Sequence, residues 1–309
     1  MPARLLYTGQ VVVDLVMGLD HLPVSGGDVL ARSADFAVGG GFNVMAAAAR
    51  NGLATAYLGR HGQGRFGDLA RQAMGEEGIE VLAAVDRVRD TGLSVALIEP
   101  SAERSFISYV GAEGGLCGND LSSVAPTSDD YVFVSGYSLL HPGKVECLLE
   151  WVLDLPSGCT VVFDPGPLID APQSPVMARL LPRIDLWTCN REEAARFTGC
   201  QEVEAAMACF ASLLHGDALI LLRDGPQGCW LGRGGRIEQV QGHAVTALDT
   251  NGAGDAHAGI LLAGLAAGLT APQAARRANV GAALAVTRWG PATAPGAREI
   301  DQVLAQGKD

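Results

Sequence analysis

The sequence predicts an α/β fold of three layers, with a mainly parallel central sheet between two layers of helices and a small lid of β-strands. Two observations support this prediction. From about residue 130, short apolar and β-branched runs alternate with helix-like segments, which is the rhythm of βαβ units. In the first third, two segments alternate apolar and polar residues with no helix between their halves, as antiparallel strands outside a main sheet do.

The first third begins with an expected strand over residues 11–14, which ends at Asp14. A Gly-rich turn and a helix over 39–50 follow it. The two alternating segments cover about 28–38 and 92–110, and the second is broken near Pro100. Because no Pro- or Ser-rich linker or repeat divides the chain, we expect one domain over 1–309 with these lid strands inserted in it.

The remaining strands are expected at 131–134, 160–163, 185–188 and 218–222. Three of these runs lead into a polar residue on a turn, at Asp164, Asn190 and Asp224. Open α/β sheets bind ligands outside the carboxyl ends of their strands, so these side chains are expected to border the site.

Composition excludes several classes of partner. The chain has 309 residues and a net charge of −12, and its longest basic run is Arg276–Arg277, so neither a nucleic-acid nor a membrane partner is expected. The seven cysteines form no C-x-x-C pair, and the N-terminus lacks the regions of a signal peptide. We therefore expect a cytoplasmic protein.

The most specific motif is the run Asp249-Thr-Asn-Gly-Ala-Gly-Asp255, which opens an Ala-, Leu- and Gly-rich helix. Glycines just before a helix let backbone N–H groups converge on one point, and the helix dipole makes that point attractive to an anion such as phosphate. Asp255 would lie beside the anion as a base. The competing interpretation is an ordinary Gly turn followed by an acidic helix start.

The run closely resembles the C-terminal signature of the ribokinase/PfkB carbohydrate kinases. Residues 39–52 resemble the N-terminal signature of that family, which has a di-glycine, a nearby Asn and a small-residue helix, and the order of the two signatures also matches. The resemblance covers most of the chain and implies a ribokinase-like fold. It implies sugar contacts for Asp14, Gly39, Gly40 and Asn43, and an anion hole formed by Gly252, Ala253 and Gly254 with Asp255 as catalytic base.

The resemblance also implies a nucleotide side of the site, formed by Asn190, Arg223, Asp224, Gly225, Gly228 and Asn279. Asn190-x-x-Glu193 resembles the family's N-x-x-E, in which Glu193 would hold Mg²⁺ through water. The same four residues also fit a helix capping box, and both interpretations can hold. Asp249 is a candidate ligand for a monovalent cation, because many members of the family use K⁺ near the second signature.

Some positions depart from the family pattern. The first signature is one residue shorter than in ribokinase, Gly41 stands where many members carry Lys, and D-P-N-x-R reads Asp164-Pro-Gly-Pro-Leu168. A sugar other than ribose is therefore implied. The run from Gly62 to Gly67 reads G-x-G-x-x-G, which would suit a dinucleotide in an NAD(P)-dependent oxidoreductase.

The expected activity is ATP-dependent phosphorylation of a hydroxyl, a primary CH₂OH by preference, on a small neutral sugar. ATP and Mg²⁺ are the expected cofactors, and an Asp with an ordinary pKa of about 4 would be ionised at pH 7. A nucleoside kinase of the same family is the main alternative, and a non-catalytic sugar or nucleotide sensor is a distant one. The lid strands are also candidates for a homodimer contact.

Overall fold

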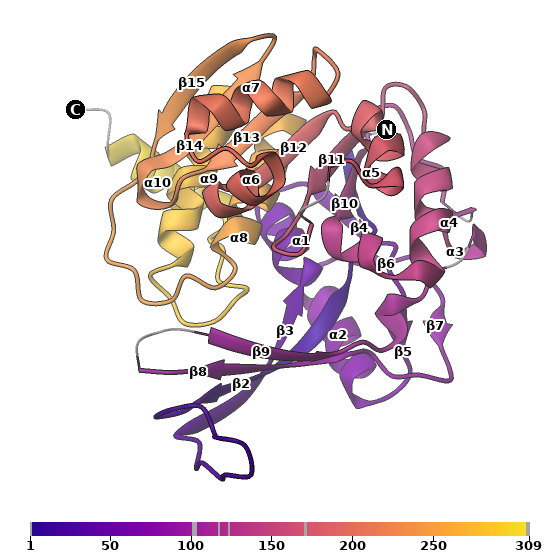
Figure 1. Ribbon diagram of the computed structural model, residues 1–309, viewed down its shortest axis with the longest axis vertical. Coiled ribbons are helices and arrows are strands. Elements are labelled where there is room, and N and C mark those ends of the chain that lie inside the picture. Colours follow the sequence, from indigo (N-terminus) through magenta and orange to yellow (C-terminus); the bar gives the residue numbers. More distant parts are fainter. Residues whose placement is uncertain (1, 101–103, 117, 123, 170–171, 307–309) are drawn as a thin grey trace.

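A large central sheet organises the molecule (Figure 1). The computed structural model describes residues 2–100, 104–116, 118–122, 124–169 and 172–306. Over these residues the sheet has nine strands in the order β15-β14-β13-β12-β11-β10-β1-β4-β6. The strands are β1 (Arg4–Tyr7), β4 (Ala54–Tyr57), β6 (Glu80–Val81), β10 (Tyr131–Ser135), β11 (Thr160–Asp164), β12 (Leu186–Asn190), β13 (Leu219–Arg223), β14 (Gly228–Arg233) and β15 (Arg236–Gln241). The sheet is parallel from β6 to β13, and β14 and β15 extend it as an antiparallel edge.

Two apolar cores lie on the two faces of this sheet. Side chains of a strand point alternately to opposite faces, and accordingly Leu5 and Tyr7 belong to one core while Leu6 belongs to the other. The first core is covered by α1 (Gly41–Arg50), α2 (Arg65–Glu76), α8 (Ala253–Ala266), α9 (Ala271–Ala285) and α10 (Ala297–Gln306). The second is covered by α3 (Gly118–Ser122), α4 (Pro142–Leu153), α5 (Pro175–Leu180), α6 (Arg191–Thr198) and α7 (Val203–Leu213). The predicted three-layer fold is confirmed.

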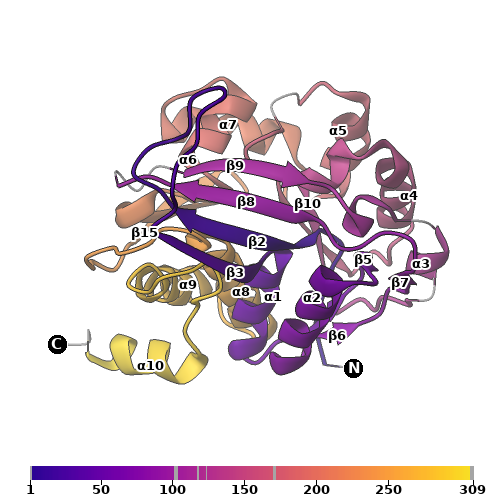
Figure 2. The ribbon, with the colours of Figure 1, turned by 90° about the horizontal axis from the view of Figure 1, so that it is seen from below.

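A second sheet forms the lid, in the order β3-β2-β8-β9. Its strands are β2 (Val11–Gly18), β3 (Ser33–Gly40), β8 (Leu93–Ile98) and β9 (Arg104–Tyr109). Figure 2 shows this sheet from its outer side, spread beside α1 and α2. β2 pairs with β3 and β8 with β9 in antiparallel fashion, whereas β2 and β8 run parallel.

The lid differs from its prediction in three respects. The strand that carries Asp14 was expected to end there as the initial strand, but Asp14 lies in the middle of β2, and the first strand of the central sheet is β1. Residues 28–32 are not part of a strand, so β3 starts at Ser33. The expected break near Pro100 lies partly at 101–103, outside the described residues.

Candidate active site

The two signature segments meet at one hydrogen bond. Asn43 lies in the first turn of α1 and Asp255 in the first turn of α8, and the Asn43 Nδ2 group donates to Asp255 Oδ2 at 3.0 Å. α1 and α8 pack closely because both present small residues, and a Cβ on Gly259 would lie 2.3 Å from the Val44 carbonyl oxygen. Segments more than 200 residues apart in sequence thus share one point.

Asp255 is a carboxylate with reduced acidity. Burial raises its pKa to about 6, and the nearby Asp164 and Glu193 carboxylates act in the same direction. The Asn43 hydrogen bond and the Arg223 guanidinium oppose the shift. The expectation of an ordinary pKa near 4 is therefore wrong, although most of the group is still ionised at pH 7.

The start of α8 provides free amides beside Asp255. Gly252 caps the helix at φ 73°, and a Cβ there would lie 1.9 Å from the Pro291 carbonyl oxygen, so the position requires glycine. Ala253 N–H already donates to the Thr250 carbonyl at 3.3 Å. Among the described residues no acceptor faces the N–H groups of Gly252 and Gly254. These two amides and the helix dipole form the part of the predicted anion hole that is free for a ligand.

Arg223 lies against this helix start. A Cβ on Gly254 would contact the Arg223 guanidinium carbon at 3.4 Å, so glycine keeps open the space between the cation and the amides. The guanidinium donates to Asp164 Oδ2 at 3.1 Å, Thr188 Oγ1 at 2.9 Å and Glu193 Oε2 at 3.4 Å. Three neighbouring strand ends, from β11, β12 and β13, supply this network, as the parallel topology requires.

The predicted capping box at Asn190 is present. Asn190 Oδ1 accepts from Glu193 N–H, and Glu193 Oε2 accepts from Asn190 N–H, both at 2.8 Å. Burial and the Asp164 charge raise the pKa of Glu193, while Arg223 opposes the shift. Glu193 Oε2 thus accepts two hydrogen bonds, from Asn190 N–H and from Arg223, and the magnesium role of Glu193 through water stays a prediction.

The loop after β13 contains Asp224 and Gly225 and leads into Gly228, the first residue of β14. Asp224 is held by the Trp230 indole N–H at 3.3 Å and by Arg191 at 3.5 Å. Gly228 adopts φ 95°, and a Cβ there would lie 2.2 Å from the Val240 carbonyl oxygen. The loop is thus fixed by its own contacts, and its nucleotide role stays a prediction.

Asn279 is buried and bonded within the protein. Its Nδ2 donates to the carbonyls of Val240 and Gln241 at 2.9 and 3.0 Å, and its Oδ1 lies 3.0 Å from His257 Nε2. Both amide protons are used, so any nucleotide contact by this side chain would first have to break one of these bonds. Here Asn279 joins α9 to α8 and to the end of β15.

Asp249 fastens the signature loop to the segment after α9. Its two carboxylate oxygens accept from Asn251 N–H at 2.9 Å and Gly290 N–H at 3.0 Å. The side chain is almost fully buried. A cation role for Asp249 stays a prediction, and among the described residues no group of three or more His, Cys, Asp or Glu could hold a metal ion.

On the lid side, Asp14 faces Gly39 across the β2–β3 pairing. A Cβ on Gly39 would lie 2.1 Å from Asp14 Oδ2, so glycine allows the carboxylate to lie over β3. Burial raises the pKa of Asp14 to about 6. No described residue donates a hydrogen bond to this carboxylate. Gly40 has φ 64° and marks the sharp turn from β3 into α1.

Sequence reasoning missed Tyr137, whose pKa responds to the carboxylates of the site, and the buried Lys144. Tyr137 lies on a 3₁₀ turn after β10 (η2, Gly136–Leu140), and burial together with Glu193, Asp255 and Asp164 raises its pKa. Lys144 of α4 is fully buried, and its Nζ donates to the Gly9 carbonyl at 3.2 Å. Burial lowers the pKa of Lys144 to about 7, against the Glu113 charge. No local pattern marks either residue, because their contacts are with distant segments.

The G-x-G-x-x-G run opens α2, but its helix start is already occupied. The Asp90 carboxylate accepts from Phe66 N–H at 3.0 Å and from Gly67 N–H at 2.8 Å. A Cβ on Gly64 would lie 2.5 Å from the same carboxylate. An internal carboxylate thus takes the position that a pyrophosphate would need, and a dinucleotide site at Gly62–Gly67 is excluded.

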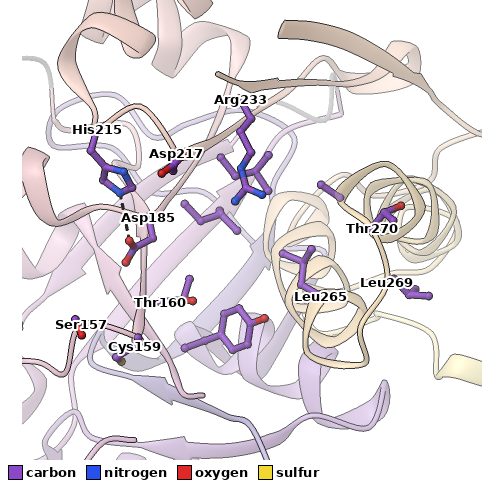
Figure 3. A pocket seen from close by; sticks show the side chains of 15 residues that line it. Ser157, Cys159, Thr160, Asp185, His215, Asp217, Arg233, Leu265, Leu269 and Thr270 are labelled. Atoms are coloured by element: carbon purple, nitrogen blue, oxygen red, sulfur yellow. Dashed lines mark hydrogen bonds and ion pairs between the residues drawn. The ribbon is translucent and has the colours of Figure 1, made fainter. Parts of the chain in front are cut away.

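A cavity of about 440 Å³ lies at the opposite edge of the sheet, where β10 to β13 begin (Figure 3). His215 Nε2 lies 3.2 Å from Asp185 Oδ1, and Asp185 also accepts from Val161 N–H and from Arg183. The Asp185 carboxylate is thus already bonded to the protein. The cavity is separated from Asp255 by the length of the strands and does not belong to the site.

A family model for pfkB family carbohydrate kinases matches residues 3–297. The chain belongs to this family. It is an ATP-dependent sugar kinase, and the interpretations as a dehydrogenase and as a sensor are set aside. No helix of the described chain is long and apolar enough to cross a membrane.

Two curated relatives of this sugar kinase span nearly its whole length. An uncharacterized sugar kinase of Escherichia coli is 29% identical and covers 96% of this chain and 92% of its own. A ribokinase of Haemophilus influenzae is 26% identical, with 94% of both chains covered. Among solved structures, a ribokinase from Thermotoga maritima aligns with a TM-score of 0.82 at 21% identity, covering 99% of this chain and 100% of its own. The structure of Arabidopsis thaliana ribokinase complexed with ribose and ATP aligns with a TM-score of 0.80 at 23% identity, covering 98% of this chain and 99% of its own.

Proposed function

We propose that this sugar kinase transfers the γ-phosphoryl group of ATP to a primary hydroxyl of a small neutral sugar, with Asp255 as general base. The observation that carries the proposal is the Asn43–Asp255 hydrogen bond, which joins the acceptor side of the site to the helix start that would bind phosphate. The acceptor would lie between Asp14 on the lid and Asp255 on α8.

In the proposed reaction, the sugar oxygen attacks the γ-phosphorus while its proton passes to Asp255. The bond from phosphorus to the β,γ-bridging oxygen breaks, and ADP leaves. The N–H groups of Gly252 and Gly254 and the Arg223 guanidinium would stabilise the negative charge on the transferred group. A pKa of about 6 makes Asp255 a stronger base than an ordinary carboxylate while it stays mostly ionised at pH 7.

Mg²⁺ belongs to the proposal because a relative, an Escherichia coli protein described as a ribokinase II, is in complex with ATP and Mg²⁺. The donor set here fits such an ion, since Asp164 and Glu193 offer carboxylate oxygens on both sides of Arg223. When bound, the ion would neutralise charge on the phosphates. A monovalent cation such as K⁺ near Asp249 is a separate part of the proposal.

A neutral acceptor is favoured by the charges around it. Asp14 and Asp255 are both acidic, and the site-facing positions of the lid next to Asp14, at Ala37 and Ser94, are uncharged. A phosphorylated sugar would bring a second negative charge close to these carboxylates, which costs several kcal/mol unless it is paired. A nucleoside is the alternative acceptor, because Phe106 lies on the same face of the lid and is exposed.

An ADP-release assay with aldoses, ketoses, nucleosides and sugar phosphates tests the proposal. We expect a neutral sugar to give the highest kcat/KM and Asp255→Asn to lower its kcat by roughly 10²- to 10⁴-fold. A nucleoside as best acceptor would select the alternative, and a sugar phosphate as best acceptor would overturn the neutral-substrate proposal.

We also propose that the kinase is a homodimer through the lid and acts in the cytoplasm, where thiols stay reduced. The row Phe36, Leu15, Val95 and Ile107 crosses all four lid strands on the face opposite to Asp14 and is entirely apolar. Part of this row packs on α2 through the Phe36–Phe66 ring contact, and Ile107 is 66% exposed. A second copy of the same face would cover it.

A further inference from the structure

Three polar side chains lie side by side across the lid. Asp14 of β2 is paired with Ser94 of β8, and Ser94 is paired with Ser108 of β9. Residues at paired positions project from the same face of a sheet, and neighbouring strands lie about 4.8 Å apart. The three groups therefore form one continuous polar row.

The middle of the row is buried at Ser94, whereas its β9 end at Ser108 is exposed. In β8, Ser94 and Ala96 are buried, whereas Val95 and Leu97, which point to the other face, are only partly buried. The opposite face also carries Phe36, whose ring contacts Phe66 of α2. Since Gly39 lies against Asp14 on the same face and leads directly into α1 with Asn43, the row opens toward the acceptor side of the site.

The serine pair has unused hydrogen-bonding capacity. The two hydroxyl oxygens lie 3.2 Å apart, so one donates to the other. The second hydroxyl keeps its proton, and both oxygens keep lone pairs. Beside them the Asp14 carboxylate has no donor among the described residues. One end of the row can therefore only accept, while the other can both donate and accept.

We infer that the Ser94–Ser108 pair is a specificity subsite that binds a second hydroxyl of the acceptor, adjacent to the hydroxyl that donates to Asp14. The inference rests on the proposed function and narrows its substrate class to polyhydroxylated acceptors with neighbouring hydroxyl groups. A carboxylate or phosphate at this position is disfavoured by Asp14, and an apolar substituent would leave the serine proton unpaired.

The test combines substrate and enzyme changes. The best sugar of the acceptor screen and each of its mono-deoxy analogues are assayed with wild type and with Ser94→Ala/Ser108→Ala. In wild type, the analogue that lacks the Asp14-bound hydroxyl should be a poor substrate. We expect one further analogue to have a kcat/KM roughly three- to tenfold below that of the parent sugar. In the double variant the parent sugar should fall by that factor, and this analogue should lose nothing further.

Ser105→Ala is the matched control, because Ser105 lies on β9 but on the opposite face, paired with Leu97. Ser105→Ala should leave the ratio of kcat/KM between the parent sugar and each analogue unchanged. An equal loss for the parent sugar and every analogue in the serine variant would overturn the subsite while leaving the kinase proposal intact. If wild type turns over no sugar, the proposed function fails, and calorimetric binding of the same sugars decides the subsite. Equal affinities of wild type and variant, or no binding, would overturn it.

Discussion

Asp255 combines two properties that work against each other. Its raised pKa makes it a better base, but the same burial means that its charge is held in the fold at a cost. The folded-state pKa of about 6 exceeds the ordinary value of 3.8, so ionisation is less favourable in the folded chain than in the unfolded one. The proposed role of Asp255 as a base would therefore come with a loss of stability.

Replacing Asp255 by Asn should separate these effects. We expect kcat to fall by roughly 10²- to 10⁴-fold, because the proton acceptor is lost. The variant should be about 1–3 kcal/mol more stable than wild type at pH 8. That advantage should shrink as the pH falls through 6 and vanish below about 4, where Asp255 is protonated in both states. Urea unfolding at the three pH values measures it; a stability difference that is independent of pH would contradict the assigned cause.

The hydrogen bond from Asn43 should set the acidic limb of the activity profile. Wild-type kcat/KM should fall below about pH 6, where Asp255 gains a proton. Because the Asn43 bond lowers the pKa of Asp255, Asn43→Ala should move that limb to higher pH. Asp14 also has a pKa of about 6, so Asp14→Asn is the control that removes its contribution. An unchanged limb in Asn43→Ala would contradict the pairing.

At the scale of elements, the β2–β3 pairing positions Asp14. In Gly39→Ala the added methyl would meet Asp14 Oδ2, so the carboxylate must move by about an ångström. A displacement of that size costs up to about 10²-fold, and we expect the KM for sugar to rise by roughly 10- to 100-fold while the KM for ATP stays the same. Gly75→Ala in α2 is the control, since nothing lies within 4 Å of its added methyl. Steady-state kinetics with both substrates distinguishes the two variants.

The start of α2 depends on Asp90, whose carboxylate accepts hydrogen bonds from the first turn of the helix. Asp90→Ala should destabilise the protein by about 1–2 kcal/mol, because the N–H groups of Phe66 and Gly67 lose their acceptor. Asp90→Asn keeps an acceptor oxygen and should recover about half of the loss. Chemical denaturation of the three proteins measures the difference, and equal losses in both variants would show that the cap is unimportant.

Elements fixed by local pattern were predictable. The runs that became β10 to β13 are short and apolar, and the capping box that begins α6 could be read from Asn190 and Glu193 alone. The assignment of β2 to the lid could not be foreseen. Its eight residues are as apolar as a central strand, and only its pairing with Ser33–Gly40 and with β8 places it in the second sheet. Long-range pairing leaves no local signal.

In the site, too, the residues marked by a local motif were predictable, and the contacts that depend on long-range pairing were not. The resemblance assigned Asn43 and Asp255 to one site from motifs at glycine-marked helix starts, and the two side chains are hydrogen-bonded to each other. It did not foresee that Asp164, Thr188 and Glu193 would share Arg223, since that network depends on the strand order. The nucleotide role of Asn279 rests on its position alone and stays a prediction, and its hydrogen bond with His257 of α8 has no local signal in the sequence.

At the scale of the whole molecule, the proposed homodimer contact can be tested on the outer face of the lid. If two copies meet there, Ile107→Glu places two charges in an apolar contact and should convert a dimer into a monomer. Val88→Glu is the control, because Val88 is 93% exposed and lies outside the lid strands. Light scattering with size-exclusion chromatography measures both masses. A wild type that is monomeric at micromolar concentration would refute the proposed contact.

The interior position of β1 also has a consequence for the synthesis of the chain. β1 lies between β4 and β10, and its partner residues on β10 begin at Tyr131, next to the Arg4–Asp130 ion pair. At about 5–20 residues per second, a ribosome needs roughly 6–25 s to proceed from one strand to the other. During that interval one edge of an apolar strand has no neighbour. We therefore expect the nascent chain to be prone to aggregation until β10 can pair with β1, and a translational pause before residue 135 should increase aggregation.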